Sequence, residues 1–526
     1  MRRILRLTVL FGFAGGLLAC EQASSRPTDA GTGVPVADAG GPRPLTWSHC
    51  PLLTGGTGND AECGVAELPL DWSKPEGRKI SVFVKRLRAA GTHRGALWLV
   101  NGGLVASGAT LELPARDLFA RKAPDLDIYI PDHRGTGRSS RLQCPQQPPM
   151  GAPLDDADVP ACVESLKAEW GDDLAHFNTT DAARDLGWLI ESERKPGEVA
   201  FAYGISYGTA VLHRYLQIFP TQPTGVVLEA LCMPGHCQMD KLDQWINQMA
   251  ERFFAECAKD TFCSSKLGPA PWGKLTDTLA SLDRGHCPAA VAAGLSRKTV
   301  RTTLGNMLGY SGWNVRPAVA AILYRLARCS DGDLPVLRHF ARAVLTPPDP
   351  PPLPEQLEAV LTGYNVTFSQ FWASPPPSIE SLQAIYDKTS AATGAALAFA
   401  PARDSWPIPP QDEYMGKWAS TQVPMLMLHG TLDFLPLEGA EAARQHFSGF
   451  NQTVAIVPRA PHATVFAPTR EGKGCSGALI GAFLKSPKEA LDLSCLGEIQ
   501  PIKFETLPGQ WADVLFRTAD IWEGTL

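Results

Sequence analysis

The sequence contains no Cys-x-x-Cys pair, although it has 13 cysteines. Structural zinc sites are usually built from such closely spaced pairs, so their absence argues against a zinc-binding protein. The chain also has no basic patch, and its formal net charge of -6 provides no electrostatic footprint for nucleic acid. An N-terminal apolar run, from Leu7 to Leu18, is too short to span a bilayer as a helix. The remaining composition, 44% hydrophobic and 19% charged over 526 residues, is that of an ordinary globular protein.

The N-terminus has the pattern of an export signal. Arg2 and Arg3 precede the apolar run, which ends in Leu-Leu-Ala-Cys at Cys20. This ending resembles a bacterial lipobox, so we expect residues 1–19 to be a lipoprotein signal peptide and Cys20 to be lipidated. An ordinary signal peptide with a chance cysteine is the alternative. Residues 20–44 then comprise the lipidated cysteine and a flexible tether, which predicts an exported lipoprotein of the cell envelope, facing the periplasm or lying at the cell surface.

The other twelve cysteines form an even set in a chain that is expected to meet an oxidising compartment. Twelve cysteines allow about ten thousand pairings, so the sequence alone does not determine the connectivity. Their spacing nevertheless suggests six short, sequential loops: Cys50 with Cys63, Cys144 with Cys162, Cys232 with Cys237, Cys257 with Cys263, Cys287 with Cys329, and Cys475 with Cys495.

Apolar runs and periodic patterns predict the elements of the folded body. Strands are expected at 80–84, 96–100, 126–130, 199–201, 225–231, 423–428 and 453–457. Helical patterns are expected at 180–191, 211–219 and 477–484, and they dominate between the fifth and sixth of these strands. This order predicts a mostly parallel α/β sheet flanked by helices, with a large helical lid inserted between the sixth strand of the fold and the late strands. The body then divides into an N-terminal part of the core (45–231), the lid (232–415) and a C-terminal part of the core (416–526).

One motif organises the whole chain. Gly204-Ile205-Ser206-Tyr207-Gly208 lies between a strand-like run and a helix-like run, where a strained turn holds a serine hydroxyl at the end of a sheet. Side chains two residues to either side of the serine would collide with the neighbouring strand or helix, which explains the glycines. A serine hydroxyl needs a base to accept its proton and a carboxylate to orient that base. In this architecture the chain order is Ser, then Asp or Glu, then His.

Asp433 and His462 fit that order. Asp433 directly follows a late predicted strand, whereas Asp404, the alternative acid, lies before that strand. The alternative interpretation of Asp433 is a purely structural one, in which its side chain forms an Asx turn. His462 follows the last predicted strand, and no histidine follows it in the chain. His429 and His133 are expected to support the structure rather than to react.

The attacked carbonyl oxygen becomes an anion and needs hydrogen-bond donors already aimed at it. We expect one donor to be the backbone N–H of Tyr207, immediately after the nucleophile. The other is expected from the glycine-containing loop after the strand at 96–100, where the N–H of Gly103 is favoured and Leu104 is the neighbouring alternative. Glycines that serve only a tight turn are the structural interpretation of the same loop.

Five features occur together and in order: Asn101-Gly102-Gly103, residues 132–139 with the sequence DHRGTGRS, the serine motif, Asp433 and His462. Together they resemble the prolyl iminopeptidase and tripeptidyl aminopeptidase branch of the α/β-hydrolases, over about residues 45–500. The resemblance implies an α/β-hydrolase fold and a secreted serine hydrolase that removes residues from peptide N-termini without a cofactor. The cysteine pairs and the segment after Asp433 also resemble the tripeptidyl group.

The sequence departs from this family at two places. Gly103 is followed by Leu104 where the family usually has proline, and the strand at 225–231 carries Glu229-Ala230 where an aspartate and a glycine are common. Aminopeptidases of this kind also need acidic groups to bind the ammonium of the substrate. Three acidic residues of the predicted lid could serve, but each is better explained as part of a solvated helix face, so none is assigned this role: Asp240, Glu251 and Glu256.

The sequence therefore predicts a lipid-anchored serine exopeptidase that acts on peptides and attaches to the membrane through Cys20. It does not determine the oligomeric state, although a monomer is favoured. Its catalytic residues would be Ser206, Asp433 and His462. A carboxylic-ester hydrolase with the same triad is one alternative. A non-catalytic binding lipoprotein is another, and the complete triad speaks against it.

Overall fold

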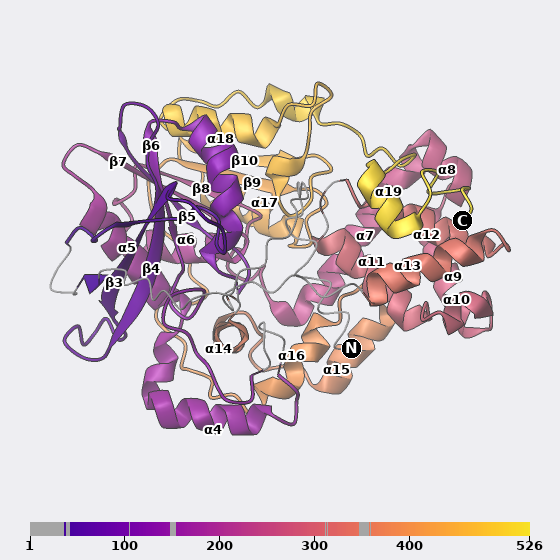
Figure 1. The fold of residues 1–526 in the computed structure, drawn as a ribbon, viewed down its shortest axis with the longest axis horizontal. Coiled ribbons are helices and arrows are strands. Elements are labelled where there is room, and N and C mark those ends of the chain that lie inside the picture. Colours follow the sequence, from indigo (N-terminus) through magenta and orange to yellow (C-terminus); the bar gives the residue numbers. More distant parts are fainter. Residues whose placement is uncertain are drawn as a thin grey trace.

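The structure is a computed structural model that describes residues 36–37, 43–104, 106–147, 154–310, 312, 314–346, 357 and 359–526. The predicted signal peptide, Cys20 and nearly all of the tether lie outside these residues. Figure 1 shows two lobes, a sheet with flanking helices and a bundle of helices beside it. Within the described part of the chain, no helix is both long enough and apolar enough to cross a membrane.

A single sheet forms the frame of the larger lobe. Its strands are β1 (Val36–Ala37), β2 (Ser48–Cys50), β3 (Ala61–Pro69), β4 (Lys79–Leu87), β5 (Gly95–Val100), β6 (Leu126–Pro131), β7 (Val199–Ile205), β8 (Gly225–Glu229), β9 (Met425–Gly430) and β10 (Gln452–Val457). The spatial order is β1-β3-β4-β6-β5-β7-β8-β9-β10, with β2 paired to β3 outside this path. β4 pairs in antiparallel orientation with β3 on one side and with β6 on the other. The next pairs in the spatial order, from β6 and β5 to β9 and β10, are all parallel. The mostly parallel sheet that the sequence predicts is therefore confirmed.

Three strands at the N-terminal end of the sheet, β1, β2 and β3, were not predicted. β1 lies inside the range expected to be tether, yet it pairs with β3. β3 escapes the pattern because Glu62, Gly64 and Glu67 interrupt its small apolar side chains. The helical insertion follows β8, which is the strand expected at 225–231, and it ends before β9, so its predicted place in the chain is confirmed.

Side chains alternate between the two faces of the sheet. Trp98 and Val100 of β5 enter one hydrophobic cluster, and Leu97 and Leu99 enter another. The first face is covered by α5 (Thr179–Glu193), α6 (Tyr207–Ile218) and α17 (Leu437–His446). The second is covered by the segment η1 (Gly108–Leu111), α2 (Glu112–Pro114), η2 (Ala115–Phe119) and α3 (Ala120–Lys122), and by α18 (Cys475–Lys485). Burial on both faces explains why the central strands are continuous apolar runs.

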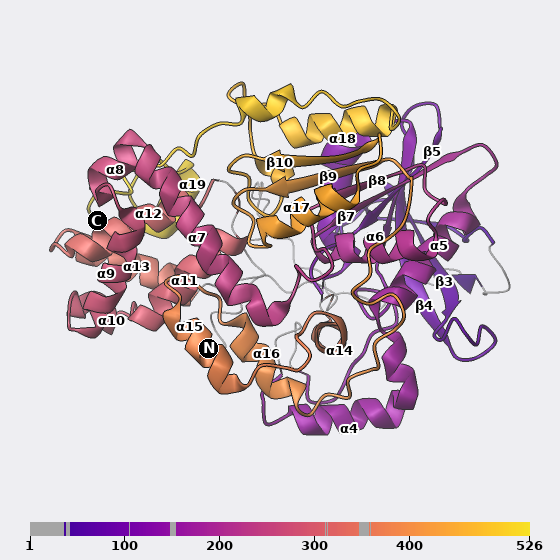
Figure 2. The ribbon, with the colours of Figure 1, turned by 180° about the vertical axis from the view of Figure 1, so that it is seen from behind.

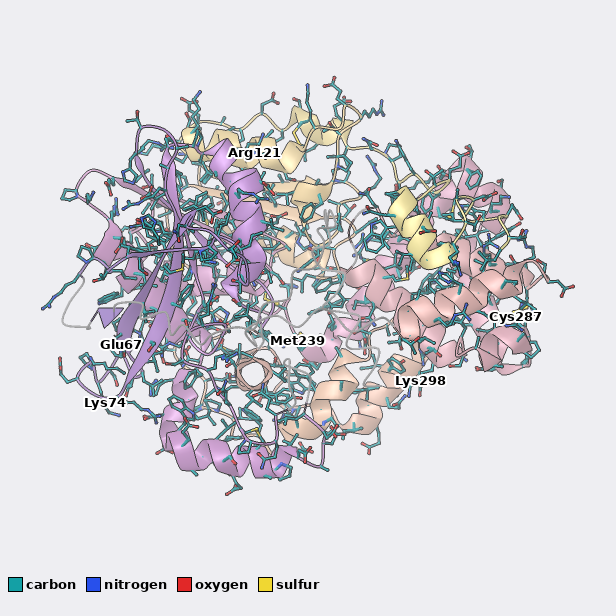
Figure 3. The ribbon with its side chains drawn as sticks, in the orientation of Figure 1. Glu67, Lys74, Arg121, Met239, Cys287 and Lys298 are labelled. Atoms are coloured by element: carbon teal, nitrogen blue, oxygen red, sulfur yellow. A yellow bond between two sulfur atoms is a disulfide. The ribbon has the colours of Figure 1, made fainter. Side chains whose placement is uncertain are left out.

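The insertion between β8 and β9 is helical, as predicted. Its elements are η5 (Met239–Lys241), α7 (Leu242–Lys259), α8 (Thr261–Leu267), α9 (Pro271–Asp283), α10 (Pro288–Ala292), α11 (Arg297–Tyr310), α12 (Pro317–Arg328), α13 (Asp333–Leu345), α14 (Val360–Gln370), α15 (Ile379–Lys388) and α16 (Ala395–Arg403). Most of these helices bury their apolar faces in a hydrophobic cluster of their own. Met239 contacts this cluster and the cluster of the sheet lobe, and Figure 3 places it between the lobes. The remaining helical elements are α4 (Val159–Trp170), η4 (Gly171–His176), η6 (Thr464–Phe466), η7 (Ser494–Glu498) and α19 (Gly509–Phe516).

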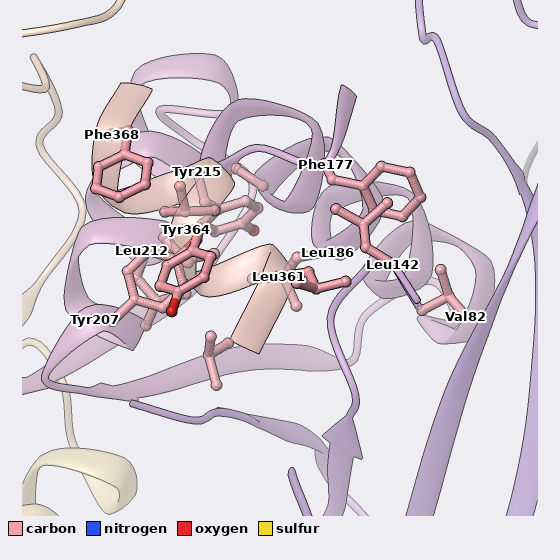
Figure 4. Close-up of a cluster of buried hydrophobic side chains, with 14 of the residues drawn as sticks. Val82, Leu142, Phe177, Leu186, Tyr207, Leu212, Tyr215, Leu361, Tyr364 and Phe368 are labelled. Carbon is pink, nitrogen blue, oxygen red and sulfur yellow. The ribbon is translucent and has the colours of Figure 1, made fainter. Parts of the chain in front are cut away.

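The last three helices of the insertion, α14, α15 and α16, bury side chains in the cluster of the sheet lobe. Leu361 and Tyr364 of α14 are buried in the sheet-lobe cluster, beside Tyr207 and Tyr215 of α6 (Figure 4). α14 therefore joins the insertion directly to the helix that begins at the predicted nucleophile.

The C-terminal end of the chain corrects the predicted domain boundary. Residues 416–526 were expected to belong to the core, but Phe504, Phe516 and Trp522 are buried in the cluster of the helical lobe. α19 lies on that lobe in Figures 1 and 2. The fully buried Arg325 of α12 also donates to the carbonyl oxygens of Ile521 and Gly524, both at 2.8 Å. An apolar helix face such as that of α19 does not by itself indicate which lobe it packs against.

Six disulfides join the pairs that the spacing suggested: Cys50–Cys63, Cys144–Cys162, Cys232–Cys237, Cys257–Cys263, Cys287–Cys329 and Cys475–Cys495. The longest loop, 42 residues, is closed by Cys287–Cys329 in the helical lobe. Disulfides in this number indicate a protein of an oxidising, extracytoplasmic compartment.

Candidate active site

Ser206 lies in a sharp turn between β7 and α6. Its backbone has φ 57° and ψ -124°, a conformation that costs energy for any residue with a side chain. A Cβ atom at Gly204 would lie 2.6 Å from the Gly208 carbonyl oxygen, and one at Gly208 would lie 2.3 Å from the Val100 carbonyl oxygen. Only glycine fits at either position, so the turn has the spacing that its motif predicted.

Asp433 and His462 are joined by a hydrogen bond. Asp433 follows β9 and His462 follows β10, and these strands pair in parallel up to Gly430 and Val457, so both side chains leave the same edge of the sheet. His462 Nδ1 lies 2.7 Å from Asp433 Oδ1. A carboxylate only accepts, so Nδ1 carries the proton and Nε2 retains a lone pair. This arrangement leaves His462 able to accept a proton at Nε2.

The same strand edge carries Ser206. β7, β8, β9 and β10 are consecutive parallel strands, so the residues that follow their carboxyl ends lie together. Ser206 and His462 are both partly exposed, and they form no hydrogen bond with each other in this structure. Hydrogen bonds between catalytic groups are often long without substrate and tighten in the complex.

Asp433 is fully buried, and two opposing effects set its pKa. Burial raises the pKa, but the charges of His462 and His429 and the hydrogen bond from His462 lower it below the ordinary value. The carboxyl group is therefore ionised at neutral pH. The Leu435 N–H also donates to Oδ1 at 2.8 Å, which fixes the orientation of the carboxylate.

Two residues of the surrounding structure hold the acid and the base in place. The ring of Phe434 stacks on His462, with 4.1 Å between the ring centroids. Arg252 of α7 donates to the carbonyl oxygens of Thr431, at 2.9 Å, and Asp433, at 3.2 Å. Through Arg252, the helical insertion is therefore hydrogen-bonded to the loop that carries Asp433.

The predicted oxyanion loop packs directly against the nucleophile. A Cβ atom at Gly102 would lie 2.7 Å from the Ser206 Cβ, so the backbone of this loop touches the serine turn. Gly103 is exposed with φ +66°, and Leu104 is partly buried against the sheet-lobe cluster. Tyr207 is the first residue of α6, where backbone N–H groups lack helical partners. Both expected sources of N–H donors thus border Ser206.

Asp132, from the DHRGTGRS segment, holds the far side of this loop. Its Oδ1 accepts from the Ser107 hydroxyl and the Gly108 N–H, both at 2.6 Å, and its Oδ2 accepts from Arg138 Nε at 2.8 Å. The Asn101 side-chain amide donates to the Ser107 carbonyl oxygen at 2.8 Å, which closes the loop. The segment thus acts as a scaffold.

The rival residues lie in structural positions. His429 is buried, and its Nδ1 accepts from the Leu231 N–H at 3.2 Å. His133 is buried with its ring edge-on to Tyr207, at 5.7 Å between centroids. The side chain of Asp404 is 77% exposed and lies 3.6 Å from Arg403. Asp433, and not Asp404, contacts His462.

Among the acidic residues of the insertion, Asp240 differs from the other two. Asp240 is 5% exposed, accepts from the Ala373 N–H at 3.1 Å, and burial raises its pKa. Glu251 is exposed, and Glu256 forms an ion pair with Lys259 at 2.8 Å.

Asp240 also lies close to the nucleophile helix. The preceding residue, Met239, donates from its backbone N–H to the Phe371 carbonyl oxygen at 2.8 Å. The ring of Phe371 lies edge-on to Tyr207, at 5.8 Å between centroids. Asp240 therefore belongs to the part of the insertion that borders the serine turn.

Sequence reasoning missed three residues near the triad. Glu229 was noticed only as a departure from the family, yet its carbonyl oxygen accepts from the Ser206 N–H at 2.8 Å. Arg252 gave no signal, because it is one of many charges on a helix. Arg316 is buried between α11 and α12, and burial lowers its pKa to about 9 while the charge of Asp433 opposes that shift. Only Glu229 had a usable signal, an acidic residue at the end of a buried strand.

Comparison with known proteins agrees with this geometry. The sequence pattern of the α/β hydrolase fold matches residues 99–265, which contain Ser206 and the oxyanion loop. The chain has the α/β-hydrolase fold. The resemblance inferred from the motifs is thereby confirmed at the level of the fold and of relatives of the tripeptidyl aminopeptidase type.

Three relatives show how much of this chain is similar to known proteins and at what sequence identity. It is 30% identical over 197 residues to a tripeptidyl aminopeptidase of Streptomyces lividans, covering 33% of this chain and 36% of that protein. It is 24% identical over 261 residues to the serine protease Hip1 of Mycobacterium tuberculosis, covering 43% and 48%. It is 27% identical over 293 residues to carboxylesterase B of the same species, covering 49% and 54%. The similarity thus spans about a third to a half of the length of these relatives.

Proposed function

We propose that this α/β-hydrolase is a serine exopeptidase that hydrolyses peptide bonds near free N-termini. The observation that carries the proposal is the hydrogen bond between His462 Nδ1 and Asp433 Oδ1, on the sheet edge that holds the strained Ser206. That combination is what a serine nucleophile requires. The similarity to a tripeptidyl aminopeptidase supports the choice of peptides as substrates.

The reaction would proceed through an acyl-enzyme. Ser206 Oγ attacks the scissile carbonyl while His462 Nε2 accepts its proton and then protonates the leaving amine. Asp433 orients the imidazole and stabilises its charged form. The backbone N–H groups of Tyr207 and of Gly103 or Leu104 would donate to the oxyanion. Water then attacks the acyl group, again with His462 as the base.

Asp240 is the carboxylate that we propose for binding the substrate's ammonium group. Of the three acidic candidates it is the buried one, and it lies on the segment that contacts Tyr207 through Phe371. A charge-assisted hydrogen bond of this kind contributes about 1.5–3 kcal/mol. Asp240→Asn is therefore expected to lower kcat/KM by roughly 10- to 100-fold on peptides with a free N-terminus.

Steady-state hydrolysis of matched substrates tests the proposal. The oxidised protein would be given tripeptide amides with a free N-terminus, the same amides acetylated, and a short-chain ester. Cleavage of the free-amine amides alone, lost in Ser206→Ala and weakened in Asp240→Asn, is the expected result. Equal cleavage of the acetylated amides would contradict recognition of the N-terminus.

Ester hydrolysis is the second candidate, and the similarity to a carboxylesterase favours it. The same triad and N–H donors serve both reactions, so only the residues of the insertion decide between them. Ester turnover with all peptides untouched would establish this alternative. A non-catalytic binding lipoprotein would show neither activity.

We further propose that the protein works in the cell envelope, anchored through a lipid on Cys20 and monomeric. The disulfides and the pattern before Cys20 support export. The helical insertion would act as a lid that restricts access to chain ends.

A further inference from the structure

We propose that Glu229 is a positioning residue that fixes the loop carrying His462 relative to the turn carrying Ser206. The inference rests on the proposed function, because it assumes that these two residues react together. Glu229 touches neither of their reacting atoms. It acts through three hydrogen bonds of its side chain and one of its backbone.

The side chain of Glu229 joins the nucleophile strand to the base loop. Its Oε1 accepts from the Thr464 hydroxyl at 2.7 Å and from the Val465 N–H at 3.0 Å. Its Oε2 accepts from the hydroxyl of Tyr203, which precedes Ser206 by three residues on β7. Glu229, Thr464 and Tyr203 are all buried. The last residue of β8 therefore holds the segment two and three residues after His462.

The other side of the base loop is held separately. The Arg459 N–H donates to the Thr431 hydroxyl at 2.7 Å, and the Leu432 N–H donates to the Ala460 carbonyl oxygen at 3.0 Å. These bonds tie the residues before His462 to the loop of the triad acid. The bonds to Glu229 tie the residues after His462 to the strand of the nucleophile. The loop that carries His462 is thus fixed on one side to the loop of Asp433 and on the other side to the strand that leads to Ser206.

The backbone of Glu229 reinforces this connection. Its carbonyl oxygen accepts from the Ser206 N–H at 2.8 Å, so one residue contacts both halves of the reacting pair. No lysine, arginine or histidine forms an ion pair with Glu229 among the described residues. An apolar side chain would fill such a site without the desolvation cost of burying a carboxyl group. The presence of glutamate is therefore better explained by its hydrogen bonds, which fix the loop of His462 relative to β7.

Four substitutions separate the contacts. Glu229→Gln keeps an acceptor for Thr464 and Val465, and its amide can donate to the Tyr203 hydroxyl. Thr464→Val removes one bond to the base loop, and Tyr203→Phe removes the bond to β7. Glu229→Leu removes all three side-chain bonds while retaining a similar volume.

The rate of phosphorylation by diisopropyl fluorophosphate measures the reacting pair without using the substrate pockets. Ser206 Oγ attacks phosphorus, the P–F bond breaks, fluoride leaves, and the serine proton passes to His462. Saturating kinetics give a maximal inactivation rate and a half-saturating concentration. Because Glu229 contacts no substrate, only the rate is expected to change.

We expect Glu229→Leu to lower the maximal rate about 100-fold, since a displacement of about 1 Å has effects of this size. Thr464→Val should lower it about 10-fold, while Glu229→Gln stays within about 3-fold of the wild type. The half-saturating concentration should stay constant in every variant.

Asp243→Asn is the matched control. Asp243 is also buried, and it accepts from the Thr393 N–H at 2.8 Å and the Gly394 N–H at 2.9 Å, at the start of α16. It should lose thermal stability at an unchanged inactivation rate. A wild-type rate in both Glu229→Leu and Thr464→Val, with only their melting temperatures lowered, would overturn the inference. If Glu229→Leu does not fold, a wild-type rate in Thr464→Val overturns it alone.

The failure of the proposed function has a different signature. A wild-type protein that does not react at Ser206 would refute the triad, and the inference would fall with it. A wild-type protein that reacts while every Glu229 and Thr464 variant matches its rate would refute the positioning role and leave the proposed function standing.

Discussion

Asp433 shows how the protein lowers the pKa of a carboxyl group that is fully buried. Burial raises the pKa of the carboxyl group, and the neighbouring His462 and His429 outweigh that effect and lower the pKa below its ordinary value. The ionised carboxylate then selects the tautomer of His462 in which Nε2 is the acceptor. The chemistry therefore depends on a charge that the protein stabilises in its interior.

Asp433→Asn should lower kcat on the order of 10⁴-fold, because a neutral amide no longer selects the reactive tautomer. The fold should persist, since the Leu435 N–H can still donate to the amide oxygen. Steady-state kinetics together with near-UV circular dichroism measure the two effects. Asp404→Asn is the control, since this exposed side chain should leave kcat unchanged. A variant at Asp433 with a tenth or more of wild-type kcat would refute its role.

The candidate residues of the triad could be proposed from the sequence, whereas the residues that hold them could not. Ser206, Asp433 and His462 are each of a reactive type and each follow a predicted strand, so position and chemistry agree. Glu229 reaches Thr464 across 235 residues of sequence, and Arg252 reaches Asp433 across 181. Such contacts depend on how the lobes and strands pack together in three dimensions, and the pattern of residues along a short stretch of sequence does not predict that packing.

At the scale of elements, the turn between β7 and α6 depends on close backbone packing. The carbonyl oxygen of Val100, at the end of β5, occupies the space that a Cβ at Gly208 would need. The start of α6 therefore lies directly on the neighbouring strand, and this approach is what brings the oxyanion loop to Ser206.

Gly208→Ala should destabilise the protein by about 3 kcal/mol and abolish activity, because its Cβ would lie 2.3 Å from a carbonyl oxygen. Gly273→Ala is the matched control. Gly273 lies in α9 with no atom within 4 Å of its Cβ position, so alanine should stabilise by about 0.5 kcal/mol. Urea unfolding and kcat measure both variants. Equal stabilities would contradict the packing described for this turn.

α6 also contains a buried histidine that makes the fold sensitive to acid. His213 Nε2 accepts from the Ala419 N–H at 3.0 Å, and burial, with smaller effects of Arg214 and His446, lowers the pKa to about 3. The ordinary pKa is 6.5, so between pH 6.5 and pH 3 the ring of His213 binds a proton in the unfolded chain but stays neutral in the folded protein. The stability contributed by the neutral ring is present above pH 6.5 and is lost as the pH falls towards 3.

We therefore expect the wild type to lose about 2 kcal/mol of stability through His213 between pH 7 and pH 5. His213→Gln removes the titrating ring, so its stability should fall less over this range, although it starts lower. His49→Gln, at an exposed position of β2, should keep the wild-type slope. Urea unfolding at both pH values measures these slopes, and a wild-type slope in His213→Gln would be contrary evidence.

At the scale of the molecule, the described residues form three hydrophobic clusters, one on each face of the sheet and one in the helical lobe, and the chain crosses between the two lobes more than once. The sheet lobe could be predicted because its central strands are buried on both faces and read as apolar runs. The helical insertion was also evident, since strand patterns disappear over its length. The assignment of α14 to the sheet lobe and of α19 to the helical lobe could not be predicted, because an apolar helix face does not identify its partner.

The disulfides of the helical lobe should differ in their effect on stability. Cys287–Cys329 spans 42 residues, while Cys257–Cys263 spans 6. The entropy of loop closure predicts losses of about 4 and about 2 kcal/mol, respectively, when each pair is replaced by alanine. Urea unfolding of the two double variants measures the order, and a larger loss for the shorter loop would contradict this account.

The most direct test of the central claim is to locate the nucleophile by mass spectrometry. The protein would be treated with an alkyl fluorophosphonate, and its mass and proteolytic peptides would be compared with those of Ser206→Ala and His462→Ala. The account predicts a single adduct on the peptide that contains Ser206, absent from Ser206→Ala and formed much more slowly in His462→Ala. An adduct on another residue, or none, would contradict the triad.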